Sequence, residues 1–300
     1  MSEDPAEYSN DLPDELHRIG EQELYTPDYQ LVCAWAEQRK LAPEEVLLRL
    51  LKPTSDDGIT TEIVAGKFKS IAIEYETVLP ITKLPDTGDL TIEKLKLIGS
   101  KLTTLNLSHM PKLTELVCSH PLKELDLSPV PKLTALQCYC SQLKELDLSP
   151  VPELTELMCA DNQLTELDLS PVPNLTKLAC FENSLTELDL SHVPKLNILA
   201  CMDNQLTELD LSHVPKLTIL ACARNQIKEL DLSQVPNLTR LQSMHNQLTD
   251  LDLSHVPSLT VLECLRNQIT NLDITPLHSL KSLKHDKDKT KLIQRPDQNF

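Results

Sequence analysis

Leucines dominate the hydrophobic positions from about residue 91 onward, and they return in blocks of fixed length. Each block begins at the leucine of a segment of the form LTxLxC, and the blocks start at Leu113, Leu133, Leu154, Leu175, Leu196, Leu217, Leu238 and Leu259, with a degenerate copy at Leu280. The step is 21 residues, except that the first step is one residue shorter. A fixed period of this length predicts a solenoid, in which each turn buries its apolar side chains against its neighbours.

Two segments of each block have the alternation of a β-strand. LTxLxC and the later LTELDL both place leucines at every second residue, so both are expected to turn their leucines inward. No glycine follows Gly99. We therefore expect the bends between the segments to use Asn, Ser and the recurring Val-Pro pair, and not glycine with a positive φ.

The ends of the chain lack the regular repeat. Residues 1–55 are predicted to form a helical cap or adaptor, from the runs DELHRIGEQEL, TPDYQLVCAWAEQRK and APEEVLLRLLK, the last two with Pro27 and Pro43 at a first helical turn. Residues 56–90 contain strand-like segments that are expected to join the sheet edge. Residues 91–283 form the predicted solenoid, and residues 284–300 form a polar, frayed C-terminal tail.

The block LTELMCADNQLTELDLSPVPN, from Leu154 to Asn174, resembles a known family. It is similar to the 21-residue nested type of bacterial leucine-rich repeat, which is related to the repeats of internalins. The resemblance implies a leucine-rich-repeat solenoid of the α/β class, a curved array with the LTxLxC strands in a parallel sheet on the inner face. It also implies a scaffold for binding, without a catalysed reaction.

Asparagine recurs at the same position of six successive blocks, at Asn162, Asn183, Asn204, Asn225, Asn246 and Asn267. A buried Asn amide can satisfy loop N–H and C=O groups that no strand ladder reaches, so we interpret this column as structural.

Cysteine forms a second column, at Cys118, Cys138, Cys159, Cys180, Cys201, Cys222 and Cys264, and Ser243 takes the same slot in one block. A metal or redox array is one interpretation, because stacked strands lie about 4.8 Å apart. We favour small buried hydrophobes, because the spacing is the repeat step and not that of a CxxC ligand pair. No metal and no cofactor is expected.

Two acidic columns follow, Glu145, Glu166, Glu187, Glu208 and Glu229, and Asp147, Asp168, Asp189, Asp210 and Asp231. Cation binding is one interpretation, but calcium needs about 6 to 8 oxygens that converge on one point. We favour screened surface carboxylates, with the Asp side chains accepting backbone hydrogen bonds. His192, His213 and His255 share a further position of the block. We favour surface residues of the scaffold there, and a zinc pair at His192 and His213 is the less favoured alternative.

The variable positions are the third, fifth and seventh of each block, here called columns three, five and seven. Alternation places them on the inner face of the sheet. Apolar residues and arginines gather there, as is common at protein interfaces. The predicted apolar contacts with a partner protein are Tyr139, Met158, Phe181, Ile198, Met202, Ile219, Met244 and Leu265. Arg224, Arg240 and Arg266 lie toward one side and are expected to set the orientation of the partner.

Composition excludes some classes of ligand and indicates where the protein acts. The net charge of −17 opposes binding to nucleic acid or to an anionic membrane. The acidic N-terminus and the absence of a long apolar run predict a cytoplasmic protein, with non-classical export into host cells as the alternative.

We therefore predict a non-enzymatic scaffold that binds another protein. The alternatives are a secreted effector, a self-associating structural module and a cysteine-based enzyme. The last alternative has only Cys33 and Cys140 as candidate nucleophiles outside the cysteine column.

Overall fold

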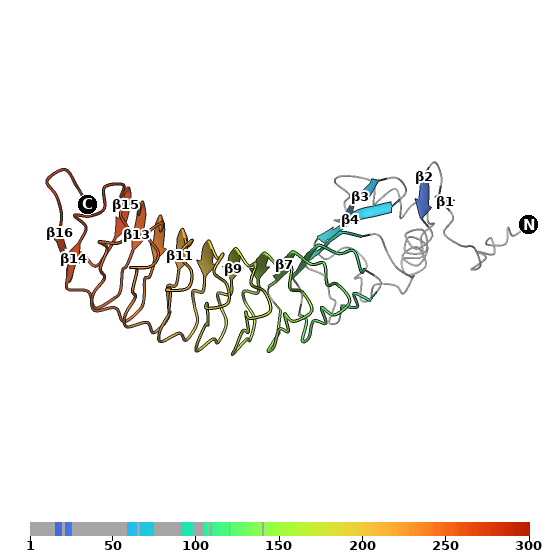
Figure 1. The fold of residues 1–300 in the computed structure, drawn as a ribbon, viewed down its shortest axis with the longest axis horizontal. Helices are drawn as coiled ribbons and strands as arrows, with labels where there is room; N and C mark the ends of the chain where they lie inside the picture. Colours follow the sequence, from blue (N-terminus) through green and yellow to red (C-terminus); the bar gives the residue numbers. More distant parts are fainter. Residues whose placement is uncertain are drawn as a thin grey trace, which may run out of the picture.

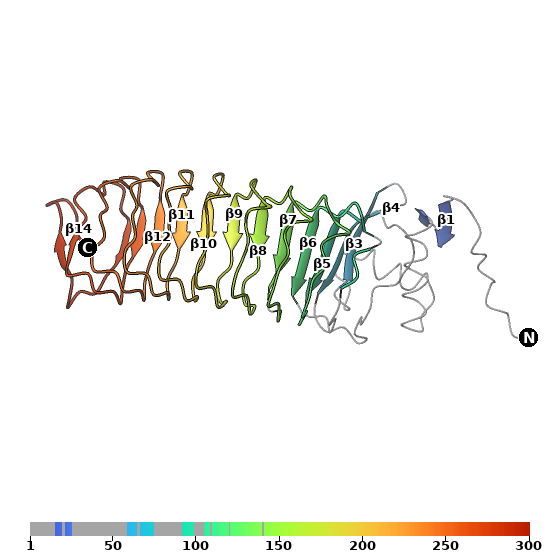
Figure 2. The same ribbon diagram turned by 60° about the horizontal axis from the view of Figure 1, so that its bottom comes forward.

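The computed structural model describes residues 92–98, 105–108, 110–119, 121–139 and 141–300, together with the backbones of strands β1 to β4. In this part of the chain the blocks are successive turns of a curved solenoid, and the strands line its concave side (Figure 1). The strands stack side by side along the length of the solenoid (Figure 2). The described residues include no helix that is long and apolar enough to cross a membrane.

One sheet runs through all turns. Its 12 strands have the order β15-β13-β12-β11-β10-β9-β8-β7-β6-β5-β4-β3, and neighbouring strands are parallel except for the antiparallel pair β3–β4. The strands are β3 Ile59–Val64, β4 Lys67–Glu74, β5 Lys94–Ile98, β6 Glu115–Ser119, β7 Ala135–Cys138, β8 Glu156–Met158, β9 Lys177–Ala179, β10 Ile198–Ala200, β11 Ile219–Ala221, β12 Arg240–Gln242, β13 Val261–Glu263 and β15 Ser282–Lys284. The predicted parallel inner sheet is confirmed.

Outside this sheet lie two short pairs. Strands β14 (Asn271–Asp273) and β16 (Lys291–Ile293) are parallel, and β1 (Leu16–Ile19) and β2 (Gln22–Tyr25) are antiparallel. Strands β1 and β2 lie within and just after the run DELHRIGEQEL, and the helical cap or adaptor predicted over residues 1–55 stays a prediction. The other helical predictions within residues 1–55 lie outside the described residues. The strands predicted between residues 56 and 90 are confirmed, and β4 joins the sheet edge beside β5.

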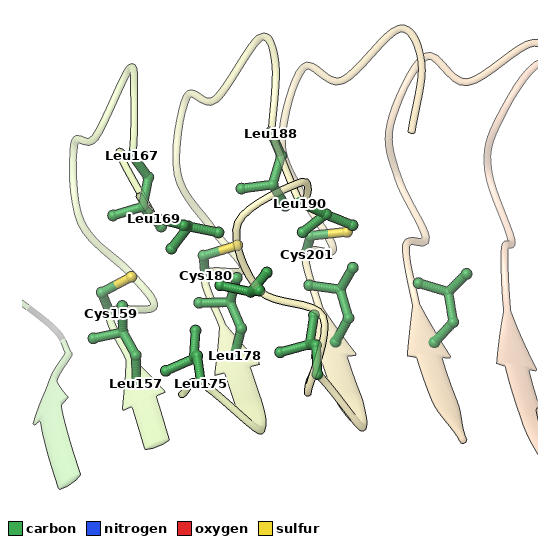
Figure 3. Close-up of a cluster of buried hydrophobic side chains, with 14 of the residues drawn as sticks. Leu157, Cys159, Leu167, Leu169, Leu175, Leu178, Cys180, Leu188, Leu190 and Cys201 are labelled. Atoms are coloured by element: carbon green, nitrogen blue, oxygen red, sulfur yellow. The ribbon is translucent and has the colours of Figure 1, made fainter. Parts of the chain in front are cut away.

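The core fills the space between the sheet and the outer wall. In each turn the strand leucine, such as Leu157 or Leu178, points inward, and these two are directly paired in register. Leucines of the LTELDL half, such as Leu167 and Leu169, pack against them from the opposite side (Figure 3). Among the described turns, however, the LTELDL half is a strand only at β14. Curvature spreads the turns apart on the convex side, so most outer segments lie too far apart for ladder hydrogen bonds.

The asparagine column links consecutive turns. In Asn225, Nδ2 donates to the carbonyl of Cys201 in the preceding turn at 2.9 Å and to that of Cys222 in its own turn at 3.1 Å. The backbone N–H of Leu206, also in the preceding turn, donates to Asn225 Oδ1 at 3.0 Å. The same contacts recur at Asn162, Asn183, Asn204, Asn246 and Asn267. One side chain thus satisfies backbone groups from two turns, as predicted.

The residue before each of these asparagines has a left-handed backbone. The residues are Asp161, Glu182, Asp203, Arg224, His245 and Arg266, with φ between 50° and 57°. The expected lack of positive-φ glycine holds, but the bend still requires a positive φ, at a cost of about 1–2 kcal/mol for each non-glycine residue. The adjoining hydrogen bonds offset this cost, including the 2.8 Å bond from Arg224 N–H to the Met244 carbonyl.

The opposite bend is held by aspartate. The N–H of Ser212 donates to Asp210 Oδ1 at 2.9 Å, and equivalent bonds form at Asp147, Asp168, Asp189 and Asp231. Hydrogen bonds from the serine backbone and hydroxyl lower the pKa of Asp210 below its ordinary value of 3.8, in spite of the neighbouring Asp189. The expected backbone hydrogen bonds to these carboxylates are confirmed.

The cysteine column is part of the core. Cys118, Cys138, Cys159, Cys180, Cys201, Cys222 and Cys264 are buried free thiols. Burial raises the pKa of Cys180 to about 12, so the neutral thiol is the stable form there. Ser243 occupies the same slot and is fully buried, but within the described residues its hydroxyl has no hydrogen-bond partner.

Residues 284–300 complete the last turn. Besides β16, the Asp286 carboxylate accepts the N–H of Arg266 at 2.7 Å, and Gln298 Nε2 donates to the carbonyl of Ile274 at 2.9 Å. Thr290 Oγ1 donates to the carbonyl of Ile269 at 2.8 Å. The frayed tail was therefore a wrong prediction. The polar side chains of residues 284–300 bind backbone groups that are bound by the next turn elsewhere in the solenoid.

Replacing Asn225 by Ala is expected to lower the free energy of unfolding by about 2–4 kcal/mol, because buried N–H and C=O groups of two turns lose their partner. Urea denaturation measures the change. Gln226→Ala is the matched control, because the Gln226 side chain is exposed. A loss at Asn225 no larger than at Gln226 would contradict the structural role of the column.

Replacing Ser243 by Cys is expected to stabilise the protein by about 1–2 kcal/mol, because an unpartnered hydroxyl is replaced by a thiol that neighbouring turns already accommodate. Thermal and urea unfolding of the two proteins test this. A destabilised Ser243→Cys variant would show that the slot is not interchangeable between turns.

The aspartate bends predict a loss of stability in acid. Because the folded-state pKa values of these carboxylates lie below their ordinary value, their contribution is full above pH 3.8 and is lost as the pH falls from there through the lower folded-state pKa. A variant with Asp168, Asp189, Asp210 and Asp231 replaced by Asn is expected to show a shallower decrease between about pH 4 and 2. Identical pH profiles for the two proteins would refute the assignment.

Candidate protein-binding face

The concave face is built from columns three, five and seven. In a typical turn the strand covers positions three to five, its middle leucine points into the core, and the third and fifth side chains point to the concave side. Position seven follows shortly after the strand. Because adjacent strands are in register, equivalent residues of successive turns stand in rows along the solenoid.

The centre of this face is apolar and lies over β9, β10 and β11. Column five provides a floor of three alanines in register, Ala179, Ala200 and Ala221. Column three contributes Ile198 and Ile219 on one side of the floor, and column seven contributes Phe181 and Met202 on the other. The predicted apolar residues are thus brought together around a shallow strip of small side chains.

These large side chains are less exposed than the sequence suggests. Phe181, Ile198, Met202 and Ile219 are half-buried, whereas the exposed large hydrophobic residues among those described are Ile293 and Phe300 near the C-terminus. Neighbours along each row cover part of their surface. The centre therefore keeps a continuous apolar surface without fully exposed anchors.

The other predicted apolar contacts extend this surface toward both ends. Met158 belongs to column five at β8, and Tyr139, Met244 and Leu265 belong to column seven. All four are half-buried.

Charged residues flank the apolar centre and pair along the rows. On the N-terminal side, Lys177 is the column-three residue of β9 and marks the margin of the apolar centre, and its Nζ lies 2.6 Å from Glu156 Oε1. On the C-terminal side the Glu263 carboxylate accepts hydrogen bonds from Lys284 at 2.7 Å and from Gln242 at 3.0 Å. The bond from Lys284 is the main cause that lowers the pKa of Glu263. Both flanks are polar, and the buried Glu263 fixes the geometry of its flank.

The three arginines do not form one group. Arg240 is in column three, within β12, whereas Arg224 and Arg266 are the left-handed residues in the loops beyond the other ends of the strands. All three arginines lie in the C-terminal half of the solenoid. Arg240 lies at the N-terminal ends of the strands, and Arg224 and Arg266 lie beyond the C-terminal ends. Arg224 Nε lies 3.7 Å from Asp203 Oδ1. Sequence alternation missed this loop position, although its place before the recurring asparagine marks it.

The outer wall carries the acidic columns. An open groove there is lined by Glu145, Asp147, Glu166 and Asp168, with Leu146 and Leu167 beneath. In the described part of the chain, no three His, Cys, Asp or Glu side chains are arranged to hold a metal ion. His192, His213 and His255 each approach the aspartate of their own turn, with Nε2 to Oδ2 distances of 3.9 to 4.0 Å. Cys33 and Cys140 lie outside the described residues.

The solenoid is similar to several solved structures. No protein-family model and no curated protein sequence matches the chain. The functional domain of InlJ from Listeria monocytogenes, described as including a cysteine ladder, is 37% identical over 71% of this chain, with a TM-score of 0.63. The chain spans 47% of that InlJ structure, so it matches about half of its length.

Two further structures share the fold. An internalin, InlF, from Listeria monocytogenes is 18% identical and covers 87% of this chain and 94% of its own, with a TM-score of 0.55. The leucine-rich-repeat ectodomain of the plant receptor kinase GASSHO1/SCHENGEN3 from Arabidopsis thaliana, in complex with CASPARIAN STRIP INTEGRITY FACTOR 2, is 19% identical. It covers 87% of this chain and 36% of its own, with a TM-score of 0.63.

The 21-residue turns, the concave parallel sheet and the buried cysteine column agree with these comparisons. The chain therefore has the leucine-rich-repeat fold, and its 21-residue repeats are similar to those of the InlJ domain.

Proposed function

We propose that this protein is a non-enzymatic scaffold that binds a partner protein on its concave face. The observation that carries the proposal is the continuous apolar centre over β9 to β11, in a chain of net charge −17 whose outer wall carries columns of Glu and Asp. A core of leucines, asparagines and cysteines already stabilises each turn. Phe181, Ile198, Met202 and Ile219 lie outside the buried core cluster, so binding gives them a role.

The local shape favours a protein ligand. Alanines in column five leave room above the sheet, so a side chain of the partner can contact Ile198, Phe181 and Met202 together. Aromatic residues and Met at the centre of an interface commonly contribute most of the affinity. The polar flanks restrict the orientation of the partner.

The comparisons support the class of function and not the partner. A plant leucine-rich-repeat ectodomain with this fold was solved in complex with CASPARIAN STRIP INTEGRITY FACTOR 2, but an identity of 19% relates the two chains by fold alone. The InlJ domain extends well beyond the region that this chain matches. The partner is accordingly defined here by its chemistry, a protein with an exposed apolar anchor.

The double substitution Phe181→Glu and Met202→Glu is expected to abolish partner binding, because two carboxylates would be desolvated at the apolar centre. Affinity capture from native lysate with mass spectrometry compares this variant with the wild type. The matched control is Thr186→Glu and Thr207→Glu, which adds the same charge at exposed positions of the outer wall.

Circular dichroism first establishes that both variants are folded. A protein retained by the wild type and by the control, but lost from the Phe181 and Met202 variant, supports the proposal. An unchanged set of captured proteins in all three samples would contradict it.

A further inference from the structure

A row of exposed and half-exposed residues lies in the loops beyond the C-terminal ends of the strands. This side of the solenoid is called its edge below, and it is not an outer strand of the sheet. It consists of the six left-handed residues, which occupy position eight of successive turns: Asp161, Glu182, Asp203, Arg224, His245 and Arg266. Their φ angles agree within 7°, so each backbone sends its side chain in the same direction. We call this row the edge row.

The charges of the edge row are sorted along the solenoid. The first three residues are acidic, and the last three are Arg, His and Arg. The change of sign falls between Asp203 and Arg224, which form an ion pair at 3.7 Å. Read in the opposite direction, the row presents the complementary order of groups. It therefore matches a second copy of itself that runs antiparallel.

The curvature of the solenoid permits this arrangement. The strands line the inside of an arc (Figure 1). A two-fold axis along the sheet normal, beside the Asp203–Arg224 pair, reverses the direction of the arc and keeps its concave side on the same side. Two copies related in this way lie side by side, edge to edge. Because their turns have equal spacing, Asp161 then faces Arg266 of the second copy, Glu182 faces His245, and Asp203 faces Arg224.

Column seven, directly next to the edge row, is complementary in size under the same symmetry. Ala160 comes opposite Leu265, and Ala223 comes opposite Met202. Both alanines are buried, with exposed fractions of 1% and 5%, whereas Leu265 and Met202 are half-exposed. Phe181 comes opposite Met244, and a Met sulfur beside an aromatic ring is a favourable contact. Two recessed positions of the column thus lie opposite two partly exposed large side chains, where the charges also match.

We propose that this edge is the interface for a second copy of the chain, in a two-fold symmetric, antiparallel, edge-to-edge dimer. A two-fold interface places the same patch on both subunits, so self-complementarity of one row is its requirement. The dimer joins two concave faces into one wider binding surface. This inference goes beyond binding of a partner, and it differs from a dimer in which the two concave faces pack against each other.

The charge pairs select the partner and its direction. Exposed ion pairs contribute little affinity individually, and the net charge of −17 on each copy opposes association. The sorted row reverses this repulsion locally, and the apolar contacts of column seven supply the remaining attraction. A dimer of this kind is expected to be reversible and dependent on concentration.

Charge reversal at the ends of the row tests the proposal by sedimentation velocity. Asp161→Arg and Arg266→Glu, made separately, are each expected to weaken the dimer by about tenfold, because like charges then meet at both symmetric sites. Both substitutions suit the left-handed backbone, because Arg and Glu already occupy this position in other turns. Circular dichroism checks that each variant is folded.

The decisive sample is an equimolar mixture of the two single variants. In the mixed dimer the introduced arginine of one copy meets the introduced glutamate of the other, and the unchanged Asp161 meets the unchanged Arg266. Dimer formation is therefore expected to return to the wild-type level. The double variant is expected to dimerise with itself. A wild-type protein that stays monomeric up to about 100 μM, or a dimer that neither single variant weakens, would overturn the proposal.

Phe181 and Met202 belong to both proposed surfaces, so binding of another protein is measured separately with Ile198→Glu and Ile219→Glu, on the other side of the alanine floor from the dimer interface. The two proposals can therefore fail independently, because a monomeric scaffold would still capture its partner on the concave face.

Discussion

The structure depends on the asparagine amide that joins each turn to the one before it. Without glycine in its repeats, the solenoid bends the chain in six of its described turns with residues that resist a left-handed backbone. The asparagine that follows each left-handed residue donates to carbonyls of both turns and accepts an N–H of the preceding one. Its six repetitions turn a local strain into a regular stack, and the leucine and cysteine columns pack in the space that this stack encloses.

This arrangement separates the residues that stabilise the fold from those that the proposed binding function uses. The hydrogen bonds of Asn, the bends of Asp and Ser, and the buried Leu and Cys side chains use the same positions in nearly every turn. Columns three, five and seven are left to vary, because their side chains leave the sheet on the concave side. A surface built on a rigid and repeated support can change its chemistry from turn to turn with little cost to folding. The apolar centre and its polar flanks are an example of such a change in surface chemistry from turn to turn.

The sequence predicted what repetition reveals and missed what depends on the individual turn. Period and alternation were enough to place the strand leucines, the asparagines and the buried cysteines, because each of these columns keeps the same type of residue at the same position of successive turns. The left-handed position was missed because its side chains differ from turn to turn and share only a backbone angle. For the same reason the separation of Arg240 from Arg224 and Arg266 became visible only in the structure. The final turn was mistaken for a tail because Asp286, Thr290 and Gln298 replace the repeat's own hydrogen bonds with polar side chains.

The central claim is that the apolar residues of the concave face serve binding and not folding. The most direct measurement is the unfolding free energy of a variant in which Phe181, Ile198, Met202 and Ile219 are all replaced by Gln, compared with Leu199→Ala in the core. The account predicts that the four surface changes together cost less than the single core change, which removes a fully buried side chain and is expected to cost about 2–5 kcal/mol. A fourfold variant that unfolds, or that loses more stability than Leu199→Ala, would show that the concave apolar residues belong to the folding core.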